Sequence, residues 1–208
     1  MSAAVPLIHS TIPYVLISGS YQRNRTNDKL CTYLGNKLAQ QNIGIISGGN
    51  KPGLKVSESM NKILTDLKQY EHDKIVTVFR RKGNKDELRI KRIESIYFVG
   101  NDIQELREFL IYKSKAIIVI DGVTKTREEV LLAQERNLPV IPVGMSGGTA
   151  YNVWIQYSKS EKYQNEASFV KLNNQNPFIA ADAVVSILND LTLNDAKKMH
   201  TKKALLSE

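Results

Sequence analysis

The segment from Lys115 to Trp154 contains the residues of this chain that are best placed to hold a phosphate. An apolar run ends at Asp121-Gly122, and after a short polar loop a helix is expected to open with the pair Glu128-Glu129. A second apolar run ends at Gly144, just before the glycine-rich turn at 146–148. Strands that end in glycine turns at helix N-termini present backbone N–H groups to which a phosphate can bind. The segment therefore predicts a nucleotide site.

Two earlier turns also place small residues after apolar runs, and their sequences are Ser18-Gly19-Ser20 and Ser47-Gly48-Gly49-Asn50. In a doubly wound sheet the carboxyl ends of the strands lie along one edge, so we expect these turns and Gly122 to line a single crevice. Each glycine turn alone is also explained by the tight connections of such a sheet. Tyr21 and Asn24 occupy the later glycine positions of the dinucleotide fingerprint, and there is no Walker lysine motif. The pattern thus argues against ordinary dehydrogenases and P-loop NTPases.

Alternating apolar and amphipathic segments must position these turns. Strands are predicted at 14–17, 43–46, 74–79, 96–98, 116–120 and 140–143. Helices are predicted at about 28–41, from the second turn to about 67, and at about 102–113, 126–136, 152–157 and 179–191, whereas 165–176 is polar and predicted to be irregular. This alternation specifies an α/β fold, a doubly wound, mainly parallel, Rossmann-like sheet with helices on both faces. We expect one domain at 13–191, with a disordered lead-in at 1–12 and a flexible tail at 192–208.

The composition excludes several classes of function. The 208 residues are 42% hydrophobic, which is enough for one sizeable core. Cys31 is the only cysteine, so no intrachain disulfide or cysteine-based zinc site can form, and the three scattered histidines lack metal-ligand spacing. We therefore expect no metal.

Since no apolar run is long enough to span a bilayer and no secretory pattern is present, a cytoplasmic protein without a membrane partner is predicted.

The chain carries 29 Lys+Arg against 21 Asp+Glu, a formal charge of +8 that favours an anionic partner. Eight basic residues lie between Lys74 and Arg92, where there are only two acids. They form either a solvated loop or a basic flap beside a polyphosphate ligand. Arg80 and Arg81, at the end of a predicted strand, are placed to close over such a ligand. A nucleic-acid surface is less favoured, because Phe79 is the only stacking aromatic among these charges.

The run from Gly122 to Glu129 resembles the G-G-x-G-T-x-x-E motif of the LOG phosphoribohydrolases, the cytokinin-activating enzymes. Together with the turns at 18–20 and 47–49, it resembles the wider SLOG superfamily, which is named for the DNA-processing and LOG proteins. The strand and turn at 140–148 are similar to the SLOG sensor domains attached to the sirtuin-like NADase effector of Thoeris antiphage defence. This resemblance, over roughly 14–190, implies binding of a cyclic or linear ADP-ribose-type nucleotide and no further cofactor. It also implies a homo-oligomer that regulates an effector domain in cis or in trans.

The resemblance assigns roles to individual residues. Glu129 matches the glutamate of the motif, which is catalytic in the hydrolases and is expected to contact the ligand's ribose in the sensor branch. Alternatively, Glu128 and Glu129 only complement a helix dipole. The hydrolases also need an arginine in the preceding helix, and strict counting places Leu106 at that position, with Arg107 one residue later. Arg107 is therefore expected to bind a phosphate, unless it is a surface arginine.

Val123 and Lys125 replace two glycines of the hydrolase motif, and side chains there crowd the approach of a phosphate to the backbone. The chain is therefore predicted to bind a nucleotide rather than to cleave it. Lys125 either adds charge to the phosphate site or faces solvent.

The alternative function is that of a LOG-like N-glycosidase acting on nucleoside monophosphates. A third possibility is a DNA-binding relative that uses the basic segment. The predicted ligand contacts are Ser18, Gly19, Ser20, Gly48, Gly49, Asn50, Arg80, Arg81, Arg107, Gly122, Lys125, Thr126, Glu129 and Gly144.

Overall fold

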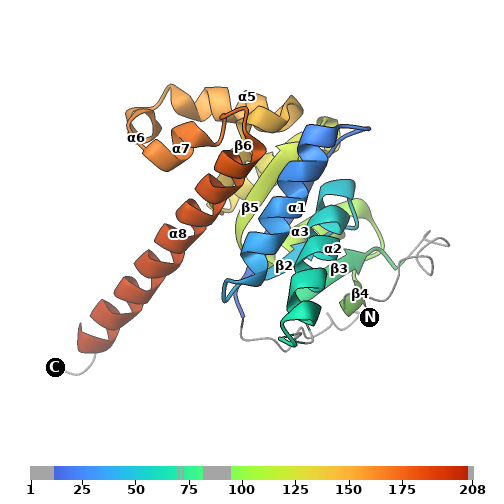
Figure 1. Ribbon diagram of the computed structural model, residues 1–208. Helices are drawn as coiled ribbons and strands as arrows, with labels where there is room; N and C mark the ends of the chain where they lie inside the picture. Colours follow the sequence, from blue (N-terminus) through green and yellow to red (C-terminus); the bar gives the residue numbers. More distant parts are fainter. Residues whose placement is uncertain (1–11, 70, 72, 82–94, 206–208) are drawn as a thin grey trace.

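The computed structural model describes residues 12–69, 71, 73–81 and 95–205, with the backbone alone for 193–205 (Figure 1). Its strands are β1 (Tyr14–Ser20), β2 (Gly44–Ser47), β3 (Ile75–Phe79), β4 (Ser95–Phe98), β5 (Ser114–Asp121) and β6 (Val140–Val143). Its helices are α1 (Arg25–Ala39), α2 (Lys51–Asp66), α3 (Ile103–Lys113), α4 (Thr124–Glu135), the short 3₁₀ helix η2 (Gly144–Ser146), α5 (Gly148–Ser158), α6 (Glu161–Gln164), α7 (Ala167–Lys171) and α8 (Pro177–Leu205). Among the residues described, no helix has the length and apolar character that crossing a bilayer requires.

The six strands form one parallel sheet in the order β4-β3-β2-β1-β5-β6. From β1 the chain builds outward through β2, β3 and β4, and then returns to place β5 on the other side of β1. The strand order therefore reverses between β1 and β5, where Leu16 pairs with Ile117 and Ser20 with Asp121. In open α/β sheets, such a reversal leaves a crevice at the carboxyl ends of the two strands.

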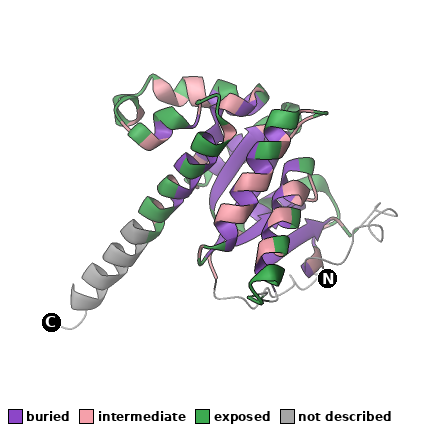
Figure 2. Cartoon of the chain, in the orientation of Figure 1, coloured by how far each residue is buried: buried purple, intermediate pink, exposed green. Residues whose placement is uncertain are grey.

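Helices cover both faces of the sheet because its central strands are apolar on both sides. These strands are buried as a result, as their purple colour in Figure 2 shows. On one face Val15 and Ile17 pack with buried residues of α1, α2 and α8. On the other face Leu16 and Ile117 pack with α3, α4 and α5. The two cores hold β1 and β5 rigidly between layers, so the ends of these strands are fixed in position.

The helix starts differ in how their free N–H groups are satisfied. Asn24, Asn50 and Asp102 cap α1, α2 and α3, and their side chains accept backbone N–H groups at 2.7 to 3.1 Å. By contrast, α4 and α5 begin at Val123 and Gly147 without a side-chain cap. In α5 the Thr149 N–H donates instead to the carbonyl oxygen of Gly122 at 2.9 Å, whereas the first N–H groups of α4 are open to another acceptor.

Gly19 permits the close approach of β1 to β5. Its φ is +140°, and a Cβ atom at this position would lie 1.9 Å from the carbonyl oxygen of Ile120. Because that oxygen belongs to the backbone of the neighbouring strand, a side chain could be accommodated only by separating the two strands. The glycine of this turn is therefore required by the fold, whatever it also does for a ligand.

The outer edge of the sheet at β6 carries a proline. Ile117 N–H donates to the carbonyl oxygen of Pro139, so in a parallel ladder the residues that face outward are Val140 and Pro142. Pro142 has no N–H group to offer on that edge.

The fold class predicted from the sequence is confirmed, and each predicted strand is present. One local prediction is wrong: the segment at 165–176 contains α7, where Phe169 is buried, and Leu172 just after the helix is buried as well. In addition, α8 continues beyond the predicted helix end at 191 to Leu205. Residues 1–11 of the predicted lead-in at 1–12 lie outside the described residues, and so does most of the basic segment, at 82–94.

Candidate functional site: a carboxylate crevice between β1 and β5

The carboxyl ends of β1 and β5 meet at the reversal of strand order, and the turns that follow them are hydrogen-bonded. Gly122 N–H donates to the carbonyl oxygen of Ser20 at 2.9 Å. Gly122 also packs against Thr126, since a Cβ at Gly122 would meet the Thr126 side chain at 2.6 Å. The start of α4 is therefore held tightly against the end of β1, and the residues of its second turn lie next to that strand.

Glu129 lies in this second turn and faces β1. Its side chain is 19% exposed, and its Oε2 accepts a hydrogen bond from the hydroxyl of Ser18, which is fully buried at the end of the strand. If Glu129 only complemented the dipole of α4, its side chain would have no reason to point toward Ser18 of β1. The predicted contact residues Ser18 and Glu129 are thus brought together.

Arg107 of α3 is buried and forms a charge cluster with the two glutamates. Its side chain is 8% exposed, with Nη2 at 2.6 Å from Glu128 Oε2 and Nε at 3.9 Å from Glu129 Oε1. The Nε–H group is buried and has no hydrogen-bond partner among the described residues. Arg107 is therefore not a surface arginine, as one alternative supposed. A phosphate at its guanidinium would have to compete with Glu128, whose side chain is 50% exposed.

Burial raises the pKa of Glu129 above its ordinary value, because a carboxylate loses hydration there. The Ser18 hydrogen bond and the Arg107 charge oppose this rise, and the Glu128 charge adds to it. Glu129 is thus a carboxyl group whose charged form is disfavoured by its surroundings, as is common at functional sites.

We expect Glu129→Gln to stabilise the ligand-free protein relative to wild type above the pKa of Glu129. Since the folded pKa is raised, the protonated form is favoured by folding below the unfolded value of about 4.5, and that contribution is lost as the pH rises through the folded value. The advantage of the glutamine variant should therefore grow as the pH increases. Thermal unfolding midpoints of both proteins between about pH 4 and pH 8 measure it. A difference that stays constant with pH would contradict the assignment.

Asp121, at the end of β5, is a site residue that the sequence analysis missed. Its carboxylate accepts N–H from Gly122 at 2.8 Å and from Asn27 Nδ2 at 3.3 Å, and burial raises its pKa. The carboxylate lies against the start of α5, where a Cβ at Gly148 would meet Asp121 Oδ1 at 2.3 Å. Its own N–H is held by the hydroxyl of Ser146 at 2.7 Å. The N-terminus of α5 is therefore next to an internal anion, which would repel a phosphate from this turn.

Asn50 has a structural role in the second turn. Its Nδ2 donates to the Ile17 carbonyl at 2.8 Å, and its Oδ1 accepts Gly53 N–H at 2.7 Å, so it joins α2 to β1. Gly48 and Gly49 precede it at the carboxyl end of β2, the strand that borders β1.

The remaining predicted contacts are spread more widely. Lys125 is exposed in the first turn of α4, whose N-terminus lacks a side-chain cap. Arg80 and Arg81 follow β3, which β2 separates from β1, and Arg81 Nε donates to the carbonyl of Phe98 at 3.4 Å. Gly144 packs against Trp154, since a Cβ there would meet the indole at 2.8 Å. The structure thus brings Ser18, Arg107, Gly122 and Glu129 into one region, and it places Arg81 and Gly144 against other neighbours.

The described residues contain no group of three or more His, Cys, Asp and Glu that could hold a metal ion. The groups in the crevice that can bind a ligand are instead carboxylates, an arginine and the backbone N–H groups of α4. These groups suit the hydroxyl and phosphate groups of a nucleotide.

Comparisons with known proteins agree with this architecture. No protein-family model matches the chain, and no curated protein matches it by sequence. Among solved structures, the structural-genomics target TM1055 has a TM-score of 0.60 at 18% identity, covering 86% of this chain and 99% of that one. The molybdenum cofactor binding protein of the phototrophic bacterium Rippkaea orientalis has a TM-score of 0.54 at 16% identity, covering 88% and 99%. DNA processing protein A of Helicobacter pylori, described as binding single-stranded DNA, has a TM-score of 0.52 at 16% identity, covering 73% and 75%.

The class of protein that these findings define is a Rossmann-like α/β domain, whose fold is similar to that of the molybdenum cofactor binding protein and of DNA processing protein A. At such identities the likeness concerns the fold. The fold that the sequence resemblance implies is thus confirmed, and membership of the superfamily and of a particular branch is a matter for proposal.

Proposed function

We propose that the crevice between β1 and β5 binds an ADP-ribose-type nucleotide, cyclic or linear, and that the protein is a nucleotide sensor of the SLOG type. The observation that carries this proposal is the inward-facing Glu129, held by Ser18 at the strand-order reversal and flanked by Arg107. A carboxylate at this point can accept hydrogen bonds from two ribose hydroxyls.

The N-termini of α4 and α5, which both lack a side-chain cap, differ in whether they can bind a phosphate. The N-terminus of α5 is next to the Asp121 carboxylate, whereas α4 has open N–H groups and the exposed Lys125 in its first turn. We therefore place a ligand phosphate at the start of α4 rather than at the start of α5. The unpartnered Nε–H of Arg107 supplies one further donor toward a ligand oxygen. Asp121 would then accept from the sugar or the base.

The output of the sensor is proposed from the resemblance alone. Occupation of the crevice would alter the packing of a homo-oligomer and thereby regulate a cytoplasmic antiphage effector, such as a sirtuin-like NADase in cis or in trans. Light scattering with and without ADP-ribose or its cyclic isomers tests the first step: the mass of the assembly should change with ligand. An unchanged mass at saturating ligand would contradict regulation through oligomer packing.

A LOG-like phosphoribohydrolase is the second candidate, favoured by one observation. Glu129 is a carboxyl of raised pKa beside Ser18 and Arg107, which suits acid–base or oxocarbenium-stabilising chemistry at a ribose. Val123 and Lys125 weigh against it, because they occupy positions where the hydrolase motif has glycine.

Binding and turnover assays separate the two functions. Wild-type protein titrated calorimetrically with ADP-ribose, its cyclic isomers and AMP should bind an ADP-ribose-type ligand saturably and release no free base during long incubation. Release of adenine from AMP would instead support the hydrolase.

We expect Glu129→Gln to weaken nucleotide binding at least about tenfold, equivalent to about 1.4 kcal/mol, since a neutral amide replaces a charged acceptor of two hydroxyls. Glu135→Gln, at the exposed end of the same helix, is the matched control and should bind as wild type does. Identical titration curves for the Glu129 variant and wild type would refute the site.

A further inference from the structure

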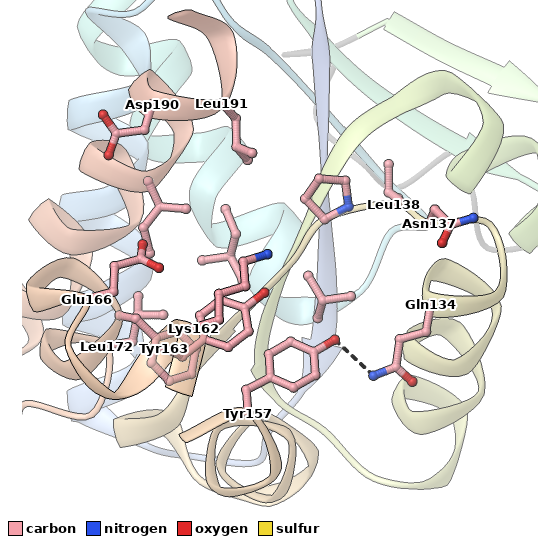
Figure 3. A pocket seen from close by; sticks show the side chains of 15 residues that line it. Gln134, Asn137, Leu138, Tyr157, Lys162, Tyr163, Glu166, Leu172, Asp190 and Leu191 are labelled. Atoms are coloured by element: carbon pink, nitrogen blue, oxygen red, sulfur yellow. Dashed lines mark hydrogen bonds between the residues drawn. The ribbon is translucent and has the colours of Figure 1, made fainter. Parts of the chain in front are cut away.

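A pocket of about 500 Å³ lies on the outer side of β6, apart from the crevice (Figure 3). It is bounded by Val140 and Ile141 at the start of β6, by Gln134 near the end of α4, and by residues of α5, α6, α7 and α8. None of the predicted crevice residues lines it. Its volume falls within the range of roughly 300 to 1,000 Å³ that is usual for small-molecule sites.

Three aromatic side chains form one wall of this pocket. Tyr157 and Tyr163 stack with ring centroids 5.3 Å apart, and Tyr163 lies 4.7 Å from Phe169, which is buried. Gln134 Nε2 donates to the Tyr157 hydroxyl at 2.9 Å and so fixes that ring. Since the rings support one another, the wall is preformed, and it can receive an apolar body without rearranging.

The pocket lining holds one basic side chain, Lys162, and two acidic ones, Glu166 and Asp190. Lys162 Nζ lies 4.9 Å from the centroid of the Tyr163 ring, and Lys162 forms no ion pair with any described residue. Figure 3 shows the Lys162 ammonium and the Tyr163 hydroxyl directed to the same side, whereas the Asp190 carboxylate points away from that ammonium. Glu166 is the remaining acid of the lining. An exposed ammonium group that forms no ion pair with a described residue thus lies beside a hydroxyl donor and the aromatic wall of the pocket.

We propose that this pocket is a second ligand site, which binds a small amphipathic anion such as an aryl or short acyl carboxylate. The carboxylate of the ligand pairs with Lys162 and the Tyr163 hydroxyl. Its apolar body packs on Val140, Ile187 and Leu191. This site goes beyond the proposed nucleotide function, because it takes a different class of ligand at a different edge of the sheet.

The probe 3-phenylpropionate and its neutral analogue 3-phenylpropanamide test the proposal by calorimetry or ligand-observed NMR. The acid should bind more tightly than the amide to the wild-type protein. Lys162→Met should weaken binding of the acid about fivefold or more, as expected for loss of a charge-assisted hydrogen bond. Lys159→Met, an exposed lysine outside the pocket, should leave the Kd unchanged. Glu166→Gln should tighten binding of the acid, since it removes a like charge.

Two controls separate this site from the crevice and from damage to the fold. Glu129→Gln should leave the Kd for 3-phenylpropionate unchanged, and saturating ADP-ribose should not displace the probe. Tyr163→Phe keeps the ring wall and should weaken binding of the acid while leaving the affinity for the amide unchanged. Equal affinity for acid and amide, an unchanged Kd in Lys162→Met, or displacement by ADP-ribose would each overturn the proposal. Binding of acidic peptides without any binding of 3-phenylpropionate would also overturn it, because the pocket would then be a contact for a protein side chain.

Discussion

Gly19→Ala is expected to lower the free energy of unfolding by about 3 kcal/mol or more. The new methyl group would lie 1.9 Å from the Ile120 carbonyl oxygen, in a backbone conformation at φ +140° that side chains rarely adopt. Backbone strain and overpacking of a tight interior each cost roughly 1 to 3 kcal/mol, and neither can relax here without separating β1 from β5. Denaturant unfolding followed by circular dichroism measures the loss.

Gly48→Ala is the matched control for this prediction. Gly48 also follows a strand at the carboxyl edge of the sheet, but its φ is not in the positive range and the nearest atom to a Cβ is Leu110 Cδ1, at 3.5 Å. We expect a change within about 1 kcal/mol of wild type. If both alanine variants lost the same stability, the close approach at Gly19 would not be the cause.

Arg107→Met is expected to destabilise the protein by about 3 kcal/mol at neutral pH and to weaken ADP-ribose binding at least about tenfold. The side chain is buried between two carboxylates, so its removal leaves Glu129 buried without a counter-charge and raises the pKa of that group further. The destabilisation should therefore be largest above that pKa and should shrink as the pH falls and Glu129 takes up a proton.

A double-mutant cycle identifies the source of this effect. Arg107→Met combined with Glu129→Gln should recover part of the stability lost in the single arginine variant, because no buried charge remains unpaired. Arg136→Met, an exposed arginine at the end of α4, is the control and should change stability by no more than about 0.5 kcal/mol. Strict additivity of the two substitutions would show that Arg107 and Glu129 do not interact.

The sheet and the position of the crevice could be predicted from local sequence patterns. Short apolar runs that end in small residues specify buried parallel strands, and parallel strands place their ends along one edge. Ser18 and Glu129 therefore had to lie near each other once the strand order was set. The start of the first helix was predicted too late, at about residue 28 rather than Arg25, because Asn24 was not recognised as its capping residue.

The charge pairing within the crevice was not predictable in the same way. Whether Arg107 contacts Glu128, Glu129 or solvent depends on the side-chain directions of two helices that are separated in the sequence by β5. The acceptor role of Asp121 depends on Asn27, far away in sequence. One signal was present: Asn27 falls on the apolar face of α1, with Leu30 and Leu34, where an amide needs a partner.

The short helices α6 and α7 were not predicted, because each has too few residues to show a periodic spacing of apolar side chains. In α7 only Phe169 is buried, so the segment contains no periodic repeat by which to recognise a helix. Its neighbours Lys162 and Glu166 look like ordinary surface charges in the sequence. Their place in the lining of the pocket follows from the packing of Phe169 and Leu172 into the core.

Pro142 on the open side of β6 also bears on how copies of this protein could associate. A strand added at that border would find the Val140 N–H group but no second donor two residues later, so an intermolecular ladder would lack one of its hydrogen bonds there. Pro142 thus disfavours continuous β-sheet growth between chains at β6. Assembly on this flank of the domain is then favoured through helices and side chains.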